Sequence, residues 1–141
     1  MRIFIWITLL IPFALCGQVL STITTHKAIN AKQFVKESLY FAYMFEEEIF
    51  YIKDNDSGSL SSYKNVEFYD EDFDDGGYYT LTFSSNLASH ILKGNEKGGI
   101  GVFAVFFDKK GGTILGVRVH KLNQQVQIYL TDEGIKKFTS G

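Results

Sequence analysis

The chain has 141 residues, a formal net charge of −2 and a hydrophobic fraction of 45%, and aromatic residues make up 16% of it. This length corresponds to a single domain, and the share of large apolar residues is too high for an intrinsically disordered protein. The slightly acidic balance argues against general nucleic-acid binding, because neutralising phosphates requires a strongly basic face. We therefore expect one folded domain with no nucleic-acid partner.

The N-terminus has the parts of a membrane-directing leader. Arg2 precedes an uncharged apolar stretch over residues 3–15, and small residues follow, at which cleavage before Gly17 is expected. The apolar character resumes after Gly17, so an uncleaved membrane anchor fits the pattern equally well. Residues 1–20 are thus a signal peptide or an anchor, and the choice stays open. In both interpretations residues 21–141 form an extracytoplasmic domain.

Cys16 is the only cysteine, so the chain can form no intramolecular disulfide and no cysteine-based metal site. Acylation of a lipoprotein cysteine requires a small residue just before it, and Leu15 occupies that position. We interpret Cys16 as a small apolar residue of the leader.

The segment Thr25–Lys53 predicts one long helix. It contains no glycine or proline, and apolar side chains recur at steps of three and four. The residues at this spacing are Val35, Leu39, Ala42, Phe45, Ile49 and Ile52. Additional aromatic residues widen the apolar surface, so we expect a sheet to cover the helix. The polar run Asp54–Ser62 ends it.

The rest of the sequence predicts an antiparallel sheet with short helical pieces. Expected strands are Asn65–Tyr69, Tyr78–Phe83, Ile100–Phe107, Ile114–His120 and Gln125–Leu130. A helix from Ser84 or Ser85 to Lys93, a loop over Gly94–Gly99 and a last helical turn from Thr131 or Asp132 to Phe138 complete the chain. The expected fold class is α+β: a leader or anchor helix, then a long aromatic-rich helix packed on an antiparallel sheet of four or five strands.

The acidic run Asp70–Asp75 is the most visible candidate for a site. Alternating carboxylates suit calcium, but an EF-hand starting at Asp70 would have Asp75 where the turn requires glycine and Leu81 where a bidentate glutamate belongs. We favour an exposed acidic loop and keep a cation site of another type as the alternative.

The other polar residues that could form a site are not expected to lie close together. Glu46–Glu48 would span about 300° of a helix rim at about 100° per residue, which indicates an exposed patch. His26, His90 and His120 lack the spacing of metal ligands. Since no nucleophile or phosphate-binding motif is present, we predict no catalytic, cofactor-binding or metal residues and a protein that is not an enzyme.

In layout the sequence resembles type IV pilus biogenesis proteins, and most closely the PilM-like family encoded with thin conjugative pili. The shared features are the short leader, the segment AINAKQFVKESLYFAYMF, the Gly101-Val102 strand, the Gly111-Gly112 hairpin and the terminal QIYLTDEGIKKF. The resemblance covers most of the chain in outline and includes no diagnostic motif; the only proline is Pro12, whereas the family has proline-containing turns. It implies a non-enzymatic envelope protein that assists pilus assembly through protein contacts at the inner membrane.

A second hypothesis uses the same leader and the same aromatic surface. The chain would be a periplasmic accessory or sensory protein that protects or modulates a membrane-bound transcription regulator, with the aromatic surface binding a ligand or partner. A secreted hydrolase or toxin is the third class, and no catalytic residues support it. All three place the protein in the periplasm, on the inner membrane or outside the cell.

Overall fold

Strands, and not the predicted long helix, form the first half of the chain in the computed structural model, which describes residues 18–73, 76–85, 100–121 and 124–140. The strands are rich in β-branched and aromatic residues, which fit a pleated and half-buried surface. Their bounds are β1 (Val19–Ala28), β2 (Phe34–Met44), β3 (Ile49–Asp54), β4 (Leu60–Tyr63), β5 (Val66–Phe73), β6 (Tyr79–Ser85), β7 (Ile100–Phe107), β8 (Ile114–Lys121) and β9 (Gln127–Leu130). The helix α3 (Asp132–Thr139) follows β9.

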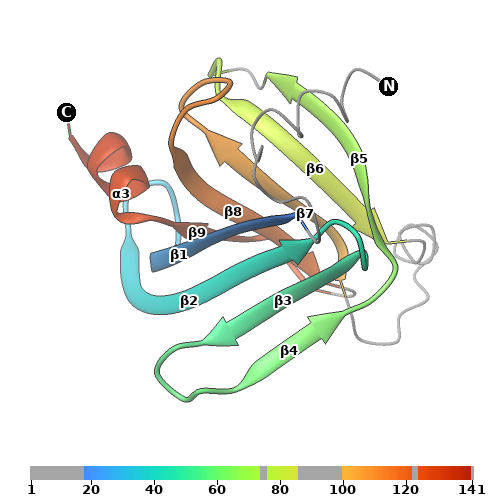
Figure 1. Cartoon of the computed structure of the whole chain (residues 1–141). Coiled ribbons are helices and arrows are strands. Elements are labelled where there is room, and N and C mark those ends of the chain that lie inside the picture. The colour runs from blue at the N-terminus through green and yellow to red at the C-terminus, as the bar shows by residue number, and fades with distance from the viewer. Residues whose placement is uncertain (1–17, 74–75, 86–99, 122–123, 141) are drawn as a thin grey trace.

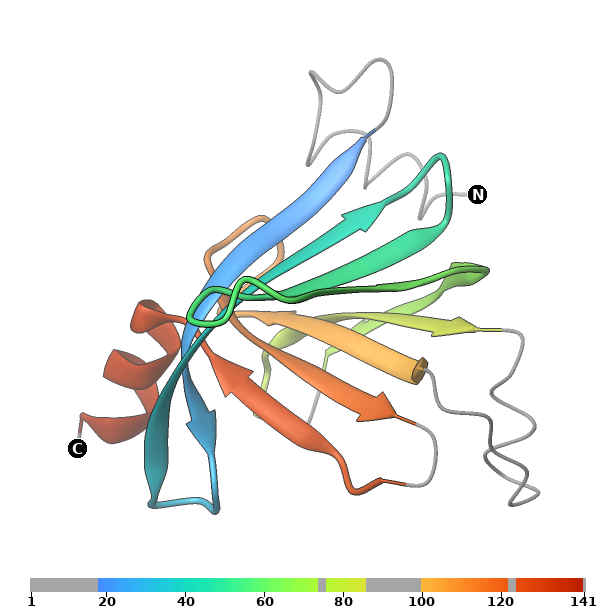
Figure 2. The same ribbon diagram turned by 90° about the horizontal axis from the view of Figure 1, so that it is seen from below.

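The nine strands form one antiparallel sheet in the order β4-β3-β2-β1-β9-β8-β7-β6-β5. Each half of the chain runs as a meander, and β9 returns beside β1 to join the two halves. The end strands β4 and β5 are separated in sequence only by residues 64–65, so the sheet curls back on itself (Figure 1). Seen from below, β1–β4 and β5–β9 form two groups of strands that fan out from the side on which α3 lies (Figure 2).

Val66, the first residue of β5, hydrogen-bonds to β2 and to the β2–β3 turn. Its N–H donates to the Glu48 carbonyl at 3.0 Å, and its carbonyl accepts a hydrogen bond from the buried Tyr43 hydroxyl. The residue before it, Asn65, has a φ of 60°, a left-handed conformation that asparagine tolerates better than most residues. This local geometry turns the chain from β4 into β5.

The main core lies inside the curl and is largely aromatic. Phe103 of β7 stacks on Phe50 of β3 with ring centroids 3.6 Å apart, and on Phe83 of β6 at 4.6 Å. All three side chains are at most 1% exposed. At about 25 cal/mol per Å² of apolar surface removed from water, such rings dominate the energy that holds the two groups of strands together.

The helix predicted over Thr25–Lys53 is wrong, and with it the α+β fold class. The segment forms the end of β1, then β2 and β3. On β2 the buried residues Leu39, Phe41 and Tyr43 recur at every second position and face the core, as strand geometry requires. Ala42 is also buried, on the opposite face. Apolar groups on both faces of one strand produced spacings of three and four that imitated a helix.

Two hairpin turns inside this segment contain no glycine or proline. In the β1–β2 turn the Asn30 side chain accepts hydrogen bonds from the N–H groups of Lys32 and Gln33, both at 2.9 Å. In the β2–β3 turn Glu48 adopts a φ of 58°. Glu46–Glu48 therefore lie on an exposed turn and not on a helix rim.

The second half of the chain follows the prediction more closely. The strands at β7, β8 and β9 and the short terminal helix are confirmed, while the first expected strand extends to Phe73. Ser84 and Ser85 end β6 instead of starting a helix. The rest of that predicted helix, the loop that follows it and the leader up to residue 17 lie outside the described residues.

Val19 and Leu20, which the anchor interpretation places in the membrane segment, are the first residues of β1. Among the described residues no helix has the length and apolar character needed to cross a membrane.

Candidate functional site

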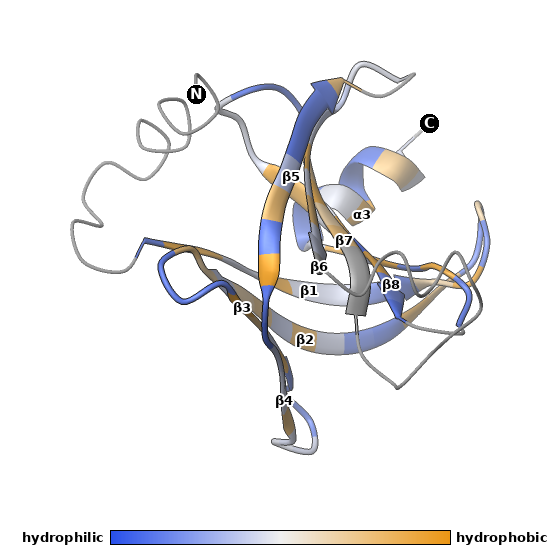
Figure 3. Ribbon diagram, turned by 90° about the vertical axis from the view of Figure 1, so that its right-hand side faces the viewer, coloured by the Kyte–Doolittle hydropathy of each residue, from blue (hydrophilic) through white to orange (hydrophobic). Residues whose placement is uncertain are grey.

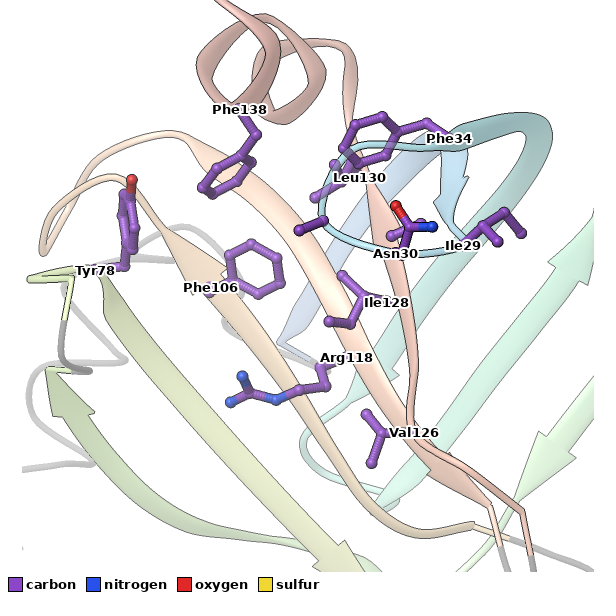
Figure 4. A pocket seen from close by; sticks show the side chains of 12 residues that line it. Ile29, Asn30, Phe34, Tyr78, Phe106, Arg118, Val126, Ile128, Leu130 and Phe138 are labelled. Atoms are coloured by element: carbon purple, nitrogen blue, oxygen red, sulfur yellow. The ribbon is translucent and has the colours of Figure 1, made fainter. Parts of the chain in front are cut away.

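A groove of about 560 Å³ lies on the outer face of the sheet, beside α3 and the β1–β2 turn (Figure 4). Its volume falls in the range of about 300–1,000 Å³ that is usual for small-molecule sites. It is lined by Ala28, Ile29, Asn30, Ala31, Phe34, Tyr78, Phe106, Arg118, Val126, Ile128, Leu130 and Phe138. The lining is thus mainly apolar, with Asn30 and the Tyr78 hydroxyl as polar groups and Arg118 as the one cation.

Thr131 and Gly134 fix α3 as one wall of the groove. The Thr131 side chain caps the helix by accepting from the Gly134 N–H at 3.0 Å, and its hydroxyl donates to the Ile114 carbonyl at 2.8 Å. A Cβ on Gly134 would lie 2.0 Å from the Leu115 carbonyl oxygen. Only glycine lets the helix approach β8 this closely.

The floor beside α3 is built around Gly116. A Cβ there would lie 2.5 Å from the tip of the Phe106 ring, so the missing side chain makes room for that ring. Phe106 and Leu130 flank Gly116 on the two neighbouring strands and pack with Leu115 in a second small core. The residues of this second core form and support the floor of the groove.

Aromatic contacts and the β1–β2 turn complete the walls. The Phe138 ring lies 5.5 Å from that of Tyr78 and 6.4 Å from that of Phe106. The Thr25 hydroxyl donates to Asp132 at 2.9 Å and so ties β1 to the start of α3. These contacts within the protein fix the two walls relative to the sheet.

Arg118 is the single charged side chain of the groove. It projects from β8 on the outer face, between Ala104 of β7 and Ile128 of β9 in the register of the sheet. Figure 4 shows its guanidinium on the side of Phe106 opposite Phe138. The residue is half-buried, and in the described part of the chain its side chain makes no hydrogen bond or ion pair.

The nearest carboxylate along the same row of the outer face is too distant to neutralise Arg118. Asp70, Thr82, Ala104 and Arg118 lie in register on β5 to β8. Three strand spacings of about 4.8 Å separate the backbones of Asp70 and Arg118 by roughly 14 Å.

The groove gathers exposed apolar side chains. Of the nine large hydrophobic residues that are exposed among those described, four line it. They are Ile29 at 55%, Val126 at 48%, Phe138 at 39% and Ile128 at 36% exposed. Scattered exposed hydrophobics are ordinary, whereas a cluster that rims a concavity is typical of binding sites.

The tyrosines with raised pKa values belong to the interior and not to the groove. Burial raises the pKa of Tyr43 and of Tyr79, and burial with Glu37 nearby raises the pKa of Tyr129 to about 12. All three face the main core. They stay protonated in the fold, so they are structural groups and not acid–base candidates for the groove.

The polar candidates from the sequence do not form a site. Strand alternation divides the acidic run: Asp70 and Asp72 pair with Thr82 and Thr80 on the outer face, whereas Glu71 accepts a hydrogen bond from the inward Tyr79 hydroxyl. Figure 3 shows the end of β5 away from β4 as a continuous hydrophilic stretch. The run is therefore mainly strand and not loop, and Asp74 and Asp75 lie outside the described residues.

No group of three or more potential metal-binding side chains occurs within the described ranges. His26 lies 2.9 Å from the Thr25 hydroxyl, and His120 lies on β8; His90 is outside the described residues. Sequence reasoning missed the groove, since its walls come from distant segments. The one available signal was Arg118, the only charged residue in the apolar strand ILGVRVH.

Searches against protein-family models, curated proteins and solved structures give no match.

Proposed function

We propose that this chain is a non-enzymatic, extracytoplasmic binding protein that holds an elongated apolar ligand in the outer groove. The observation that supports this most directly is an apolar concavity of about 560 Å³ on a sheet whose main core is already filled. An apolar surface left open to water costs free energy, and a ligand that covers it recovers that energy.

The walls give a second line of support. The cap of α3, the close approach at Gly134 and the Asn30 turn fix the walls of the groove through contacts within the protein. A site that is formed in advance loses little conformational entropy on binding.

The part in type IV pilus assembly stays a separate prediction that rests on the resemblance. One of its supporting features, the long aromatic-rich helix, is replaced by β2 and β3. The terminal strand and helix remain as β9 and α3, and both contribute to the groove. An envelope protein of this kind would present the groove to its partner, and the regulator-accessory hypothesis would use it for a ligand.

Titration of the full chain with the neutral apolar dye N-phenyl-1-naphthylamine in detergent-free buffer tests the binding proposal. We expect saturable fluorescence at one site per chain. Ile29→Asp introduces a charge on the rim and is expected to weaken binding by roughly tenfold, since burying an unpaired carboxylate is unfavourable.

Ile23→Asp is the matched control. Ile23 is 54% exposed, against 55% for Ile29, and lies on β1 away from the groove lining. Dye binding that does not saturate, or that falls equally in both variants, would count against the groove as a site.

A further inference from the structure

We infer that the groove selects amphiphiles with one carboxylate at the end of an unbranched apolar chain, and that Arg118 binds the carboxylate. This inference rests on the proposed function and names the class of ligand. Arg118 is the only cation among the residues that line the groove, and its neighbours across the strands, Ala104 and Ile128, are apolar.

The charge balance supports an anionic ligand. A half-buried guanidinium beside apolar side chains is partly desolvated, and this costs free energy unless an anion is close. In the described part of the chain the Arg118 side chain has no such partner, and Asp70, on the same row, is three strands away. A ligand carboxylate would supply the missing charge.

The geometry also orients the ligand. Arg118 lies on the side of Phe106 opposite Phe138 (Figure 4), so an anionic head at Arg118 leaves the tail to run past Phe106 toward Phe138 and Leu130. A planar guanidinium can bind a carboxylate through two parallel hydrogen bonds. One cation matches a monoanion better than a doubly charged phosphate monoester.

A competing explanation is that Arg118 covers apolar surface with its aliphatic stem while its head stays in water. Under that explanation the charge would have no effect on ligand choice. The two explanations differ in a measurable way, since only the first predicts discrimination between an acid and an alcohol of the same chain length.

Displacement of N-phenyl-1-naphthylamine from the full chain by decanoate, 1-decanol and decyl phosphate near neutral pH provides the test. We expect the wild type to bind decanoate at least about tenfold more tightly than decanol, and more tightly than decyl phosphate. Arg118→Gln should weaken decanoate binding by roughly tenfold to a hundredfold, the range for losing hydrogen bonds to a charged group. Decanol binding should change less than about twofold.

Arg118→Lys serves as the conservative variant. It keeps the charge but not the planar fork, so we expect part of the lost decanoate affinity to return. Unchanged decanol binding in both variants shows that the groove is intact.

Failure of the inference and failure of the proposed function give different results. Equal binding of decanoate and decanol by the wild type, or decanoate binding that Arg118→Gln leaves unchanged, overturns the role of Arg118 while the groove stands. Tighter binding of decyl phosphate overturns the choice of a carboxylate. Absence of saturable dye binding by the wild type overturns the proposed function itself.

Discussion

At the scale of single residues, two buried threonines differ in whether their hydroxyl group has a hydrogen-bond partner. Thr24 is 0% exposed and its hydroxyl has no hydrogen-bond partner among the described residues. Thr131 is 6% exposed, and its hydroxyl contacts the Gly134 N–H and the carbonyls of Ile114 and Leu115. A hydroxyl buried without a partner costs free energy, whereas a satisfied one stabilises the fold.

We therefore predict that the substitution to valine has opposite signs at the two positions. Thr24→Val should raise the free energy of unfolding by about 1 kcal/mol, because a methyl group replaces an unpaired hydroxyl of similar volume. Thr131→Val should lower it by about 1–3 kcal/mol, because the helix cap is lost and the Ile114 carbonyl loses its hydroxyl donor. Urea unfolding followed by circular dichroism measures both changes. Destabilisation of equal size at both positions would refute this account.

At the scale of elements, the packing of α3 on β8 depends on Gly134. In an exposed helix, replacing glycine with alanine stabilises by about 1 kcal/mol. Here the added methyl would lie 2.0 Å from the Leu115 carbonyl oxygen, so α3 must move away from the sheet.

Gly134→Ala is accordingly expected to lower the free energy of unfolding by about 1–3 kcal/mol in spite of the gain in helix propensity. It should also weaken dye binding, because Phe138 moves with the helix. Lys136→Ala, at an exposed ion pair with Glu133, is the control and should change stability by less than about 0.5 kcal/mol. A gain in stability for Gly134→Ala would show that the helix is not in close contact with β8.

The elements also show which parts of the fold could be predicted from sequence. The hairpin of β7 and β8 was predictable because Gly111 and Gly112 mark its turn between two apolar runs. The turn at Glu48 has no such marker, since an ordinary residue adopts the left-handed conformation there. Without visible turns, the end of β1 together with β2 and β3 forms one uninterrupted segment, in which apolar spacings of three and four predict a helix.

The groove was not predictable for a different reason. Its walls come from the β1–β2 turn, from β7 to β9 and from α3, and only the curled sheet brings them together. The sequence shows Arg118 in an apolar strand but not that Ala104 and Ile128 flank it. Pairing between strands distant in sequence is decided by the whole fold, and local patterns do not contain it.

At the scale of the whole molecule, the two halves of the sheet are joined by an aromatic interior that contains several phenol groups. Tyr43 hydrogen-bonds to Val66 where β5 begins, Tyr79 to Glu71, and Tyr129 packs against Phe41 with centroids 5.5 Å apart. Ionising any of these phenols would place a negative charge inside the core. The free energy of unfolding should therefore fall at alkaline pH.

The direction of this pH dependence follows from the pKa values of the buried tyrosines. An unfolded tyrosine titrates near pH 10, whereas in the fold the pKa of Tyr129 is raised to about 12 by burial and that of Tyr43 is also raised. The unfolded chain loses protons first, so the stabilisation is complete below about pH 10 and is lost as the pH rises toward about 12. Each such group lowers the free energy of unfolding by at most about 1.4 kcal/mol per pH unit in that window.

Urea unfolding of the wild type, Tyr129→Phe and Tyr69→Phe at about pH 9 and about pH 11 separates this effect from general alkaline instability. Tyr129→Phe should lose less stability than the wild type between the two pH values, because one buried titrating group is gone. Tyr69 is 71% exposed, so its replacement should leave the loss unchanged. If the free energy of unfolding falls by the same amount in the wild type and in both variants, groups other than the Tyr129 phenol cause the alkaline instability.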